Sequence, residues 1–192
     1  MMEIRLLDLE QIRKVYKEYM VKDFPDDELK PLKMIEKSYE EGMYESYGLF
    51  EENNLCGYAY FVKIANENDR NDYIFDFFAV REDLRDKGYG TCFLELLKKR
   101  FANAGSMLGE VENPDSAADE TEKKTRLRRL DFYLRNGIVD TEVEVTLFGV
   151  DYKVLEVPLV TRHSVEEVKR IYRRIYRTIL PAQMYEKRVE IK

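Results

Sequence analysis

A short turn with two glycines, set between an apolar segment and an amphipathic one, constrains this chain more than any other feature. The turn spans residues 85–91, the apolar segment 73–80 and the amphipathic segment 92–101. A strand, a glycine-containing loop and a helix form a phosphate-binding turn, because the free N–H groups of the first helical turn point at the loop and the helix dipole favours an anion there. Gly88 and Gly90 permit close backbone approach and positive φ. The sequence therefore predicts a ligand that carries phosphate.

Two other phosphate-binding loops fit this segment less well. A Walker loop requires Gly-Lys-Ser/Thr after its spacer, and the sequence has none. A dinucleotide fingerprint requires a third glycine at position 93, where Phe93 stands. A further alternative is that the two glycines only permit a tight turn. The strand before the turn and the helix after it favour phosphate binding over that alternative.

Length and composition are those of a globular α/β protein. The 192 residues suffice for one domain with a sizeable core, and the chain is 44% hydrophobic and 36% charged. No apolar run approaches the ~20 residues of a membrane span, and the N-terminus lacks the apolar region of a signal peptide. Cys56 and Cys92 lie in apolar elements, which favours buried free thiols and a cytoplasmic location. The net charge of −6 argues against nucleic-acid binding and is compatible with a cationic substrate.

Hydrophobic periodicity predicts alternating strands and helices along the chain. The predicted strands are 4–7, 47–50, 55–62, 73–80, 107–111, 141–148 and 152–160, and the predicted helices are 9–22, 32–41, the segment after the turn, 119–135 and a last one from Ser164 that Pro181 closes. The order is β-α-α-β-β-β-α-β-α-β-β with an extra C-terminal helix. Strand 107–111 follows a helical crossover and can run parallel to 73–80. We therefore expect a single α/β domain with a mixed central β-sheet flanked by helices.

Two segments resemble motifs of the GNAT superfamily of acetyl-CoA-dependent N-acetyltransferases. Residues 77–80, four intervening residues and 85–91 resemble that family's central acetyl-CoA motif, and 131–138 resembles its later Phe-Tyr signature, with Ile138 where Phe is usual. The order of elements extends the resemblance over about 4–160. We accordingly expect a GNAT-like domain over 1–160 and a C-terminal helical extension over 161–192. The extension would pack on the domain or on a partner protomer, so a homodimer is an open alternative.

The resemblance implies that acetyl-CoA is the cofactor. The backbone N–H groups of the turn would hold its pyrophosphate, and exposed backbone groups at the end of strand 73–80 would pair with the pantetheine arm. A backbone N–H in the same place would serve as an oxyanion hole, and no proline in 72–80 removes a donor. The implied cofactor-binding residues are Phe78, Ala79, Val80, Arg85, Asp86, Lys87, Gly88, Tyr89, Gly90 and Thr91.

Three carboxylates are candidates for the general base that an amine acceptor requires. The resemblance places Glu110 where the family often has this base, and strand alternation puts Glu112 on the same face. Asp76 is an acid inside an apolar strand, where an unpaired charge is costly. Neighbouring carboxylates attract a cation and raise one another's pKa, which suits a base. We rank Glu110 first, Asp76 second and Glu112 third, with Asp76 and Glu112 also as acceptor-binding residues; each can instead be a salt-bridged strand residue.

Other polar residues have more limited roles. The resemblance implies that Tyr133 returns a proton to the departing thiolate, although it can also be a core aromatic. His163 is the only histidine and is expected in a linker, so we predict no metal site. The basic run 123–129 is expected to be a solvated helix face; contact of Arg126 or Arg129 with the cofactor phosphates is the alternative.

Together these features predict an N-acetyltransferase that acts on a small-molecule or peptide amine, without nucleic-acid or membrane partners. A non-catalytic acyl-CoA-binding sensor or assembly module stays open, because it would keep the same turn. A different enzyme with a phosphate-bearing ligand is the third alternative. Residues 17–46 and 149–151 are expected to determine the acceptor, whose identity the sequence does not specify.

Overall fold

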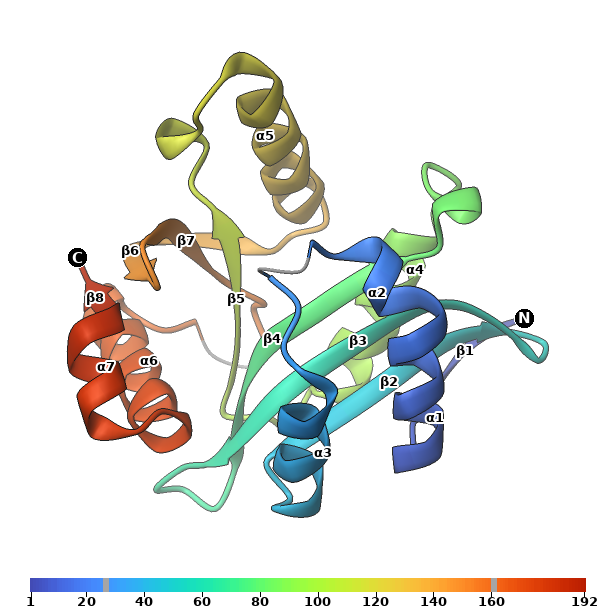
Figure 1. Ribbon diagram of the computed structural model, residues 1–192, viewed down its shortest axis with the longest axis horizontal. Coiled ribbons are helices and arrows are strands. Elements are labelled where there is room, and N and C mark those ends of the chain that lie inside the picture. The colour runs from blue at the N-terminus through green and yellow to red at the C-terminus, as the bar shows by residue number, and fades with distance from the viewer. Residues whose placement is uncertain (26–27, 160–161) are drawn as a thin grey trace. The chain divides into compact units, whose positions relative to one another are not determined.

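The computed structural model describes residues 1–25, 28–159 and 162–192 (Figure 1). The chain forms two compact units. The first contains Met1–Lys63 and Tyr73–Phe101, and the second contains Ile64–Asp72 and Ala102–Lys192. The expected division of the chain at residues 160 and 161 lies outside the described residues.

The first unit is built on four strands in the order β1-β2-β3-β4, with β1 and β3 antiparallel to β2. Helices cover both faces of these strands (Figure 1). The strands are β1 (Met2–Leu6), β2 (Tyr44–Glu51), β3 (Asn54–Ala65) and β4 (Asn71–Val80), the last two joined by a turn that belongs to the second unit. The helices are α1 (Leu9–Val15), α2 (Val21–Asp23), α3 (Leu32–Glu40) and α4 (Tyr89–Arg100).

The helix predicted over 9–22 is interrupted by a π-helical turn, Tyr16–Met20, between α1 and α2. A π turn inserts one extra residue into a helix and shifts the face that follows it. Ile12 and Val15 of α1 and Met20 at the end of the π turn are all buried. The insertion therefore keeps Met20 in the core although it is five residues beyond Val15.

Aromatic rings fill the core of the first unit on both faces of its strands. On the α4 face, Phe61 contacts four other rings, those of Tyr47, Tyr73, Phe75 and Phe101. On the α1 face, Tyr60 contacts the rings of Tyr44, Tyr58 and Phe77, and its hydroxyl donates to the carbonyl of Ile12 in α1. Adjacent residues of β3 thus anchor opposite layers, as strand alternation requires.

The second unit has four strands in the order β5-β7-β6-β8, all in antiparallel pairs. Its strands are β5 (Ser106–Glu112), β6 (Val139–Leu147), β7 (Val150–Glu156) and β8 (Val189–Ile191), and its helices are α5 (Glu120–Arg135), α6 (Val165–Ile179) and α7 (Ala182–Arg188). A capping box of Ser164 and Glu167 starts α6, at the residue where the sequence predicts the last helix to begin. Asp119 caps α5, and Gly137 follows that helix with φ +75°.

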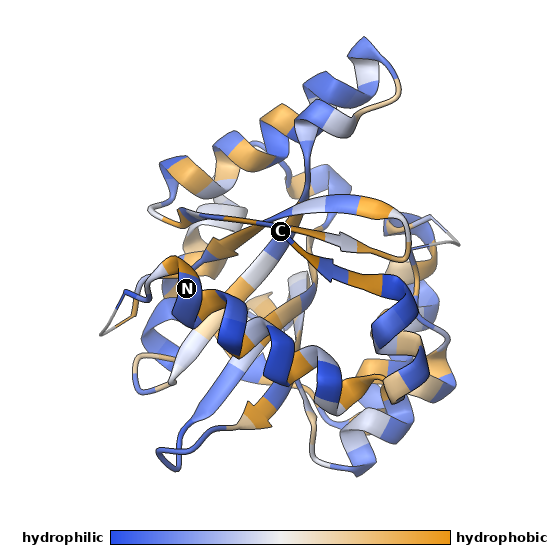
Figure 2. Cartoon of the chain, turned by 90° about the vertical axis from the view of Figure 1, so that its left-hand side faces the viewer, coloured by the Kyte–Doolittle hydropathy of each residue, from blue (hydrophilic) through white to orange (hydrophobic). Residues whose placement is uncertain are grey.

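The C-terminal extension differs from the expected single helix. α6 ends at Ile179 with Leu180 as its C-cap, and Pro181 is the N-cap of α7. The chain then returns as β8 to pair with β6. A strand of three residues has too short a pattern for periodicity to identify it. Single helices carry both hydrophilic and hydrophobic residues (Figure 2), as amphipathic packing requires.

Both cysteines are free, Cys56 buried and Cys92 half-buried, and the cytoplasmic location inferred from them stays a prediction. None of the helices in the described ranges is both long and apolar enough to cross a membrane.

Candidate active site

The predicted phosphate turn is a loop with two left-handed residues that leads directly into α4. After β4, a short 3-10 turn, Glu82–Leu84, redirects the chain. Asp86 and Gly88 then have φ of +61° and +85°, and α4 begins at Tyr89. Asp is one of the few residues with a side chain that tolerate the left-handed conformation. Glycine, which has no Cβ, adopts it without strain.

The start of α4 has no side-chain cap, in contrast to those of α1, α5 and α6. Those helices are capped by Asp8, Asp119 and Ser164, whereas Gly88 has no side chain to accept from the first turn. The first N–H groups of any α-helix have no acceptor within the helix. A Cβ built on Gly88 would meet no atom within 4 Å. Free donors at the positive end of a helix, next to open space at Gly88, fit the pyrophosphate of coenzyme A.

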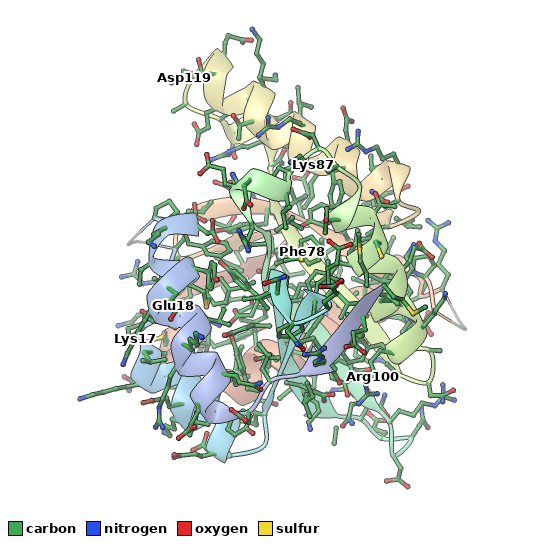
Figure 3. All side chains as sticks on the ribbon, turned by 90° about the vertical axis from the view of Figure 1, so that its right-hand side faces the viewer. Lys17, Glu18, Phe78, Lys87, Arg100 and Asp119 are labelled. Atoms are coloured by element: carbon green, nitrogen blue, oxygen red, sulfur yellow. The ribbon has the colours of Figure 1, made fainter. Side chains whose placement is uncertain are left out.

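The side chains of the turn bond to the protein itself. The Arg85 guanidinium donates to the carbonyl of Val80 and forms an ion pair of 3.2 Å with Asp23, and Lys87 Nζ donates to the carbonyl of Asp83 at 2.8 Å. Figure 3 labels Lys87 on the turn and Phe78 on β4. Because these cations are engaged, the backbone N–H groups are the main donors that the turn offers to an anion.

Beside the turn, the hydroxyl of Tyr89 donates to Glu51 Oε2 at 2.7 Å, and this hydrogen bond raises the pKa of the Tyr89 phenol. The bond ties the first residue of α4 to the end of β2.

The side-chain alternation of β4 breaks next to its acidic residue. Phe75 and Phe78 both contact rings on the α4 face, at Phe61 and Phe93 respectively. The adjacent residues Asp76 and Phe77 both contact the α1 face instead, through Tyr44 and through Phe24 and Tyr60. Two consecutive residues on one face are the signature of a β-bulge, which redirects the backbone groups that follow it. Those groups are Phe78, Ala79 and Val80, the predicted pantetheine-binding segment.

Gly57 of β3 lets the backbone at the end of β4 come close. A Cβ on Gly57 would lie 2.7 Å from the carbonyl oxygen of Ala79 and 3.4 Å from Cα of Val80. Any larger residue would push this part of β4 away. Sequence reasoning did not identify Gly57, because a glycine within a strand gives no indication of which neighbour it accommodates.

Asp76 is engaged by a cation and by a phenol. Lys30 Nζ lies 2.5 Å from its Oδ1, and Tyr44 donates its hydroxyl to Oδ2. Burial and the negative charge of Asp76 raise the pKa of Tyr44 well above its usual value, so that this phenol stays a donor. The Asp76 side chain is only 12% exposed. These contacts fit the structural alternative, in which a buried strand carboxylate is satisfied by its partners.

Glu112 is likewise engaged by cations. Its two oxygens accept from Arg126 at 3.0 Å and from Arg129 at 2.9 Å, both on α5. The expectation that the basic run 123–129 is a solvated face is wrong for Arg126, which is 7% exposed. Arg126 and Leu130 are the buried residues of α5 and are four residues apart, which places both on the inner face.

Glu110 has a different environment, built by the C-terminal extension. Tyr172 and Tyr176 of α6 each donate a hydroxyl to Oε1 of Glu110, at 2.6 Å. Burial and the charge of Glu110 raise the pKa of Tyr172 well above its usual value. The sequence analysis predicts the helix that carries Tyr172 and Tyr176 but singles out neither tyrosine. The available signal was that two phenols, four residues apart on a buried helix face, each require a hydrogen-bond partner.

Tyr133 lies on α5, with its ring 5.3 Å from that of Phe132. Burial raises the pKa of the Tyr133 phenol, and the positive charge of Arg129 opposes the shift. A phenol with a raised pKa stays protonated at neutral pH and can act as a proton donor. In the described residues no cluster of three or more His, Cys, Asp or Glu side chains could hold a metal ion.

The predicted residues divide between the two units. The turn, the end of β4 and Asp76 belong to the first, and Glu110, Glu112 and Tyr133 belong to the second. Within the second unit, Glu110 and Glu112 share β5 but are bound by different helices, α6 and α5.

Comparisons with known proteins agree with the resemblance to the GNAT family. The model of the acetyltransferase (GNAT) family matches residues 9–121. A search of curated protein sequences gives no match.

Among solved structures, the chain is similar to a GNAT-family protein from Bacteroides thetaiotaomicron, with 18% identity, a TM-score of 0.67 and coverage of 91% of this chain and 96% of that chain. It is also similar to the ribosomal-protein-S18-alanine N-acetyltransferase of Escherichia coli (15% identity, TM-score 0.59, coverage 85% and 97%). A third likeness is to a Bacillus subtilis acetyltransferase in complex with CoA, with 18% identity, a TM-score of 0.57 and coverage of 83% of this chain and 100% of that chain. These likenesses confirm the predicted α/β fold of the GNAT type.

Proposed function

The chain belongs to the acetyltransferase (GNAT) family, and from that premise we propose that it transfers an acetyl group from acetyl-CoA directly to an amine. The observation that carries this proposal is the uncapped start of α4 behind Gly88, which offers free N–H groups to a pyrophosphate. The Bacillus subtilis relative in complex with CoA supports the same cofactor class.

The cofactor-binding residues proposed are the turn 85–91 and the end of β4. Backbone N–H groups of the turn would hold the pyrophosphate, since Arg85 and Lys87 are engaged within the protein. The segment after the break at Asp76 and Phe77 would present backbone groups to the pantetheine arm and to the acyl oxygen. Bound there, acetyl-CoA supplies an activated thioester.

Glu110 is the residue we propose as general base. An acceptor amine is mostly protonated at neutral pH and must lose a proton before its lone pair can attack the acyl carbon. Asp76 is held in an ion pair with Lys30, and Glu112 in ion pairs with Arg126 and Arg129, so cations already occupy both carboxylates. The hydrogen-bond donors of Glu110 include two neutral hydroxyls. Glu110 therefore stays first, while Asp76 and Glu112 become structural residues in this proposal.

Tyr133 is proposed to return a proton to the sulfur as the thioester bond breaks. The acceptor ammonium loses two protons in all: Glu110 takes the first before attack and passes it to solvent. The second leaves the nitrogen for solvent as the amide forms and balances the one that Tyr133 gives to the sulfur, so each turnover releases one net proton. The acceptor class we propose is an amine on a small molecule or a peptide. The Escherichia coli relative, named for acetylating an alanine of a ribosomal protein, supports an amine acceptor in general and not one acceptor in particular.

The test is calorimetry with acetyl-CoA, followed by thiol release with a panel of amines. The panel should contain polyamines, amino acids, aminoglycosides and peptides with free N-termini. Binding at micromolar affinity and release with at least one amine are expected. Binding without release for every amine would favour an acyl-CoA sensor or assembly module. Absence of binding would reject the cofactor assignment.

A further inference from the structure

The C-terminal extension reaches the proposed base through two tyrosines. Tyr172 and Tyr176 are four residues apart on α6, so that their side chains lie on one face of the helix. Both hydroxyls meet the same oxygen, Oε1 of Glu110, at 2.6 Å. The two rings are stacked, with centroids 4.6 Å apart and planes at 28°. One carboxylate oxygen is thus held by a paired donor.

The element that carries these tyrosines is fixed to the second unit at several further points. The buried positions of α6 are Val168, Ile171, Tyr172, Ile175 and Tyr176. Arg174 forms an ion pair with the buried Asp72, which also accepts from Asn66 at 3.1 Å. At the start of α6, His163 contacts the buried Glu156 of β7 at 2.5 Å. The hydroxyls therefore project from a rigid support, which is what orientation of a catalytic group requires.

We propose that Tyr172 and Tyr176 are positioning residues for Glu110, so that the extension after the family core completes the catalytic site. The proposal rests on the proposed function, in which Glu110 is the base. The matched family region is 9–121, and both tyrosines lie beyond it. Both also lie in 161–192, the range expected to form the C-terminal extension.

Two effects of the paired hydroxyls follow from their geometry. They restrict the rotamer of Glu110, which keeps the carboxylate in a fixed orientation before it accepts a proton. They also donate to the ionised form, which keeps Glu110 deprotonated at lower pH than it would otherwise be. Tyr172 remains a donor throughout, because burial and the neighbouring charge raise its pKa well above the usual value.

The other charged groups on the strands around Glu110 are engaged elsewhere. On β5, Glu112 is bound by Arg126 and Arg129. On β7, Val154 is opposite Glu110, and Glu156 further along that strand is bound by His163. In the described structure, the titratable groups of α6 that form hydrogen bonds with Glu110 are the two tyrosines.

The experiment compares Tyr172→Phe, Tyr176→Phe and the double variant with wild type. Each change removes a hydroxyl and keeps the ring. Tyr185→Phe is the matched control, because Tyr185 lies in the same extension, where its ring packs under Arg177, 5.2 Å away. Thermal unfolding identifies any variant that does not fold. The measurements are kcat and KM for thiol release across pH, and the titration of the Glu110 carboxyl by NMR with carbon-13-labelled glutamate, assigned through Glu110→Gln.

We expect kcat to fall about tenfold in each single variant and about a hundredfold in the double variant, with little change in KM. The acidic limb of the rate profile and the NMR midpoint of Glu110 should both move to higher pH, by about one unit per hydroxyl removed. Tyr185→Phe should match wild type in both measurements.

Two results would overturn the proposal. One is a folded double variant whose kcat and acidic limb equal those of wild type. The other is a lower kcat with an unmoved acidic limb and an unmoved NMR midpoint, which indicates a purely structural role. Failure of the proposed function is distinguishable, because it shows as no thiol release from wild type with any amine, whatever the NMR titration of Glu110 gives.

Discussion

Arg126 of α5 and Glu112 of β5 form a buried ion pair, with 3.0 Å between Nη2 and Oε1. The same guanidinium donates to the carbonyl of Asn113 at 2.8 Å and to Glu122 at 2.7 Å. The end of β5, the turn after it and the first half of α5 are therefore joined through one side chain. Its partners satisfy a charge that would otherwise be costly to bury.

Replacing Arg126 with Met should lower the free energy of unfolding by about 2–4 kcal/mol, because Glu112 and the carbonyl of Asn113 lose their buried donor. The matched control is Arg129→Met. Arg129 binds the same carboxylate but its side chain is 45% exposed, so its loss should cost less than about 1 kcal/mol. Urea unfolding of both variants measures the difference. Equal losses of unfolding free energy in the two variants would show that burial of Arg126 does not increase its contribution to stability.

Gly88→Ala should weaken acetyl-CoA binding at least tenfold, because the proposed pyrophosphate site is the backbone of this turn and the methyl group would enter the open space beside it. Gly42→Ala is the control for backbone strain. Gly42 also has positive φ, +72°, and its Cβ would likewise meet no atom within 4 Å. Both variants should lose about 1 kcal/mol of stability. Calorimetry with acetyl-CoA separates them, and equal affinities would argue against the turn as the cofactor site.

The parts of the fold that could be predicted are those that local patterns determine. Gly88 and Gly137 have left-handed backbone conformations that favour glycine, and the start of α6 at Ser164 follows from a side chain that caps the helix. The strand 73–80 was predictable as a strand, but not the break between Asp76 and Phe77. Nearly every residue of that strand is apolar, so its sequence does not show which side chains point to which face of the sheet.

The catalytic candidates were predictable as residue types and not as environments. Glu110, Asp76 and Glu112 are all acids on strands, and only the folded chain shows which partners each one meets. Tyr172, which contacts Glu110, is 62 residues away from it in sequence. Contacts over such separations depend on the packing of α6, which periodicity identifies as amphipathic without stating what it covers.

Glu110→Gln should lower kcat by about 10²–10³-fold, since the amide cannot accept the amine proton. The loss should shrink as the pH rises, because a growing fraction of the acceptor is then already deprotonated. The control is Asp76→Asn, which removes a carboxylate that Lys30 and Tyr44 occupy. It should lower stability by about 1–2 kcal/mol and change kcat less than about fivefold. A larger effect on kcat in Asp76→Asn than in Glu110→Gln would reverse the assignment of the base.

The contact of His163 with Glu156 should make stability depend on pH. The hydrogen bond to Glu156 raises the pKa of His163 above its usual value of 6.5, so the folded state binds the proton more tightly than the unfolded state. The resulting stabilisation is complete below that usual value and is lost as the pH rises through the folded-state pKa. Urea unfolding from about pH 5.5 to about pH 9 should therefore show a decline in wild type that is weaker in His163→Gln. His163 is the only histidine in the chain, so no second imidazole contributes to the difference. Parallel curves for the two proteins would mean that the pair contributes no pH-dependent stability.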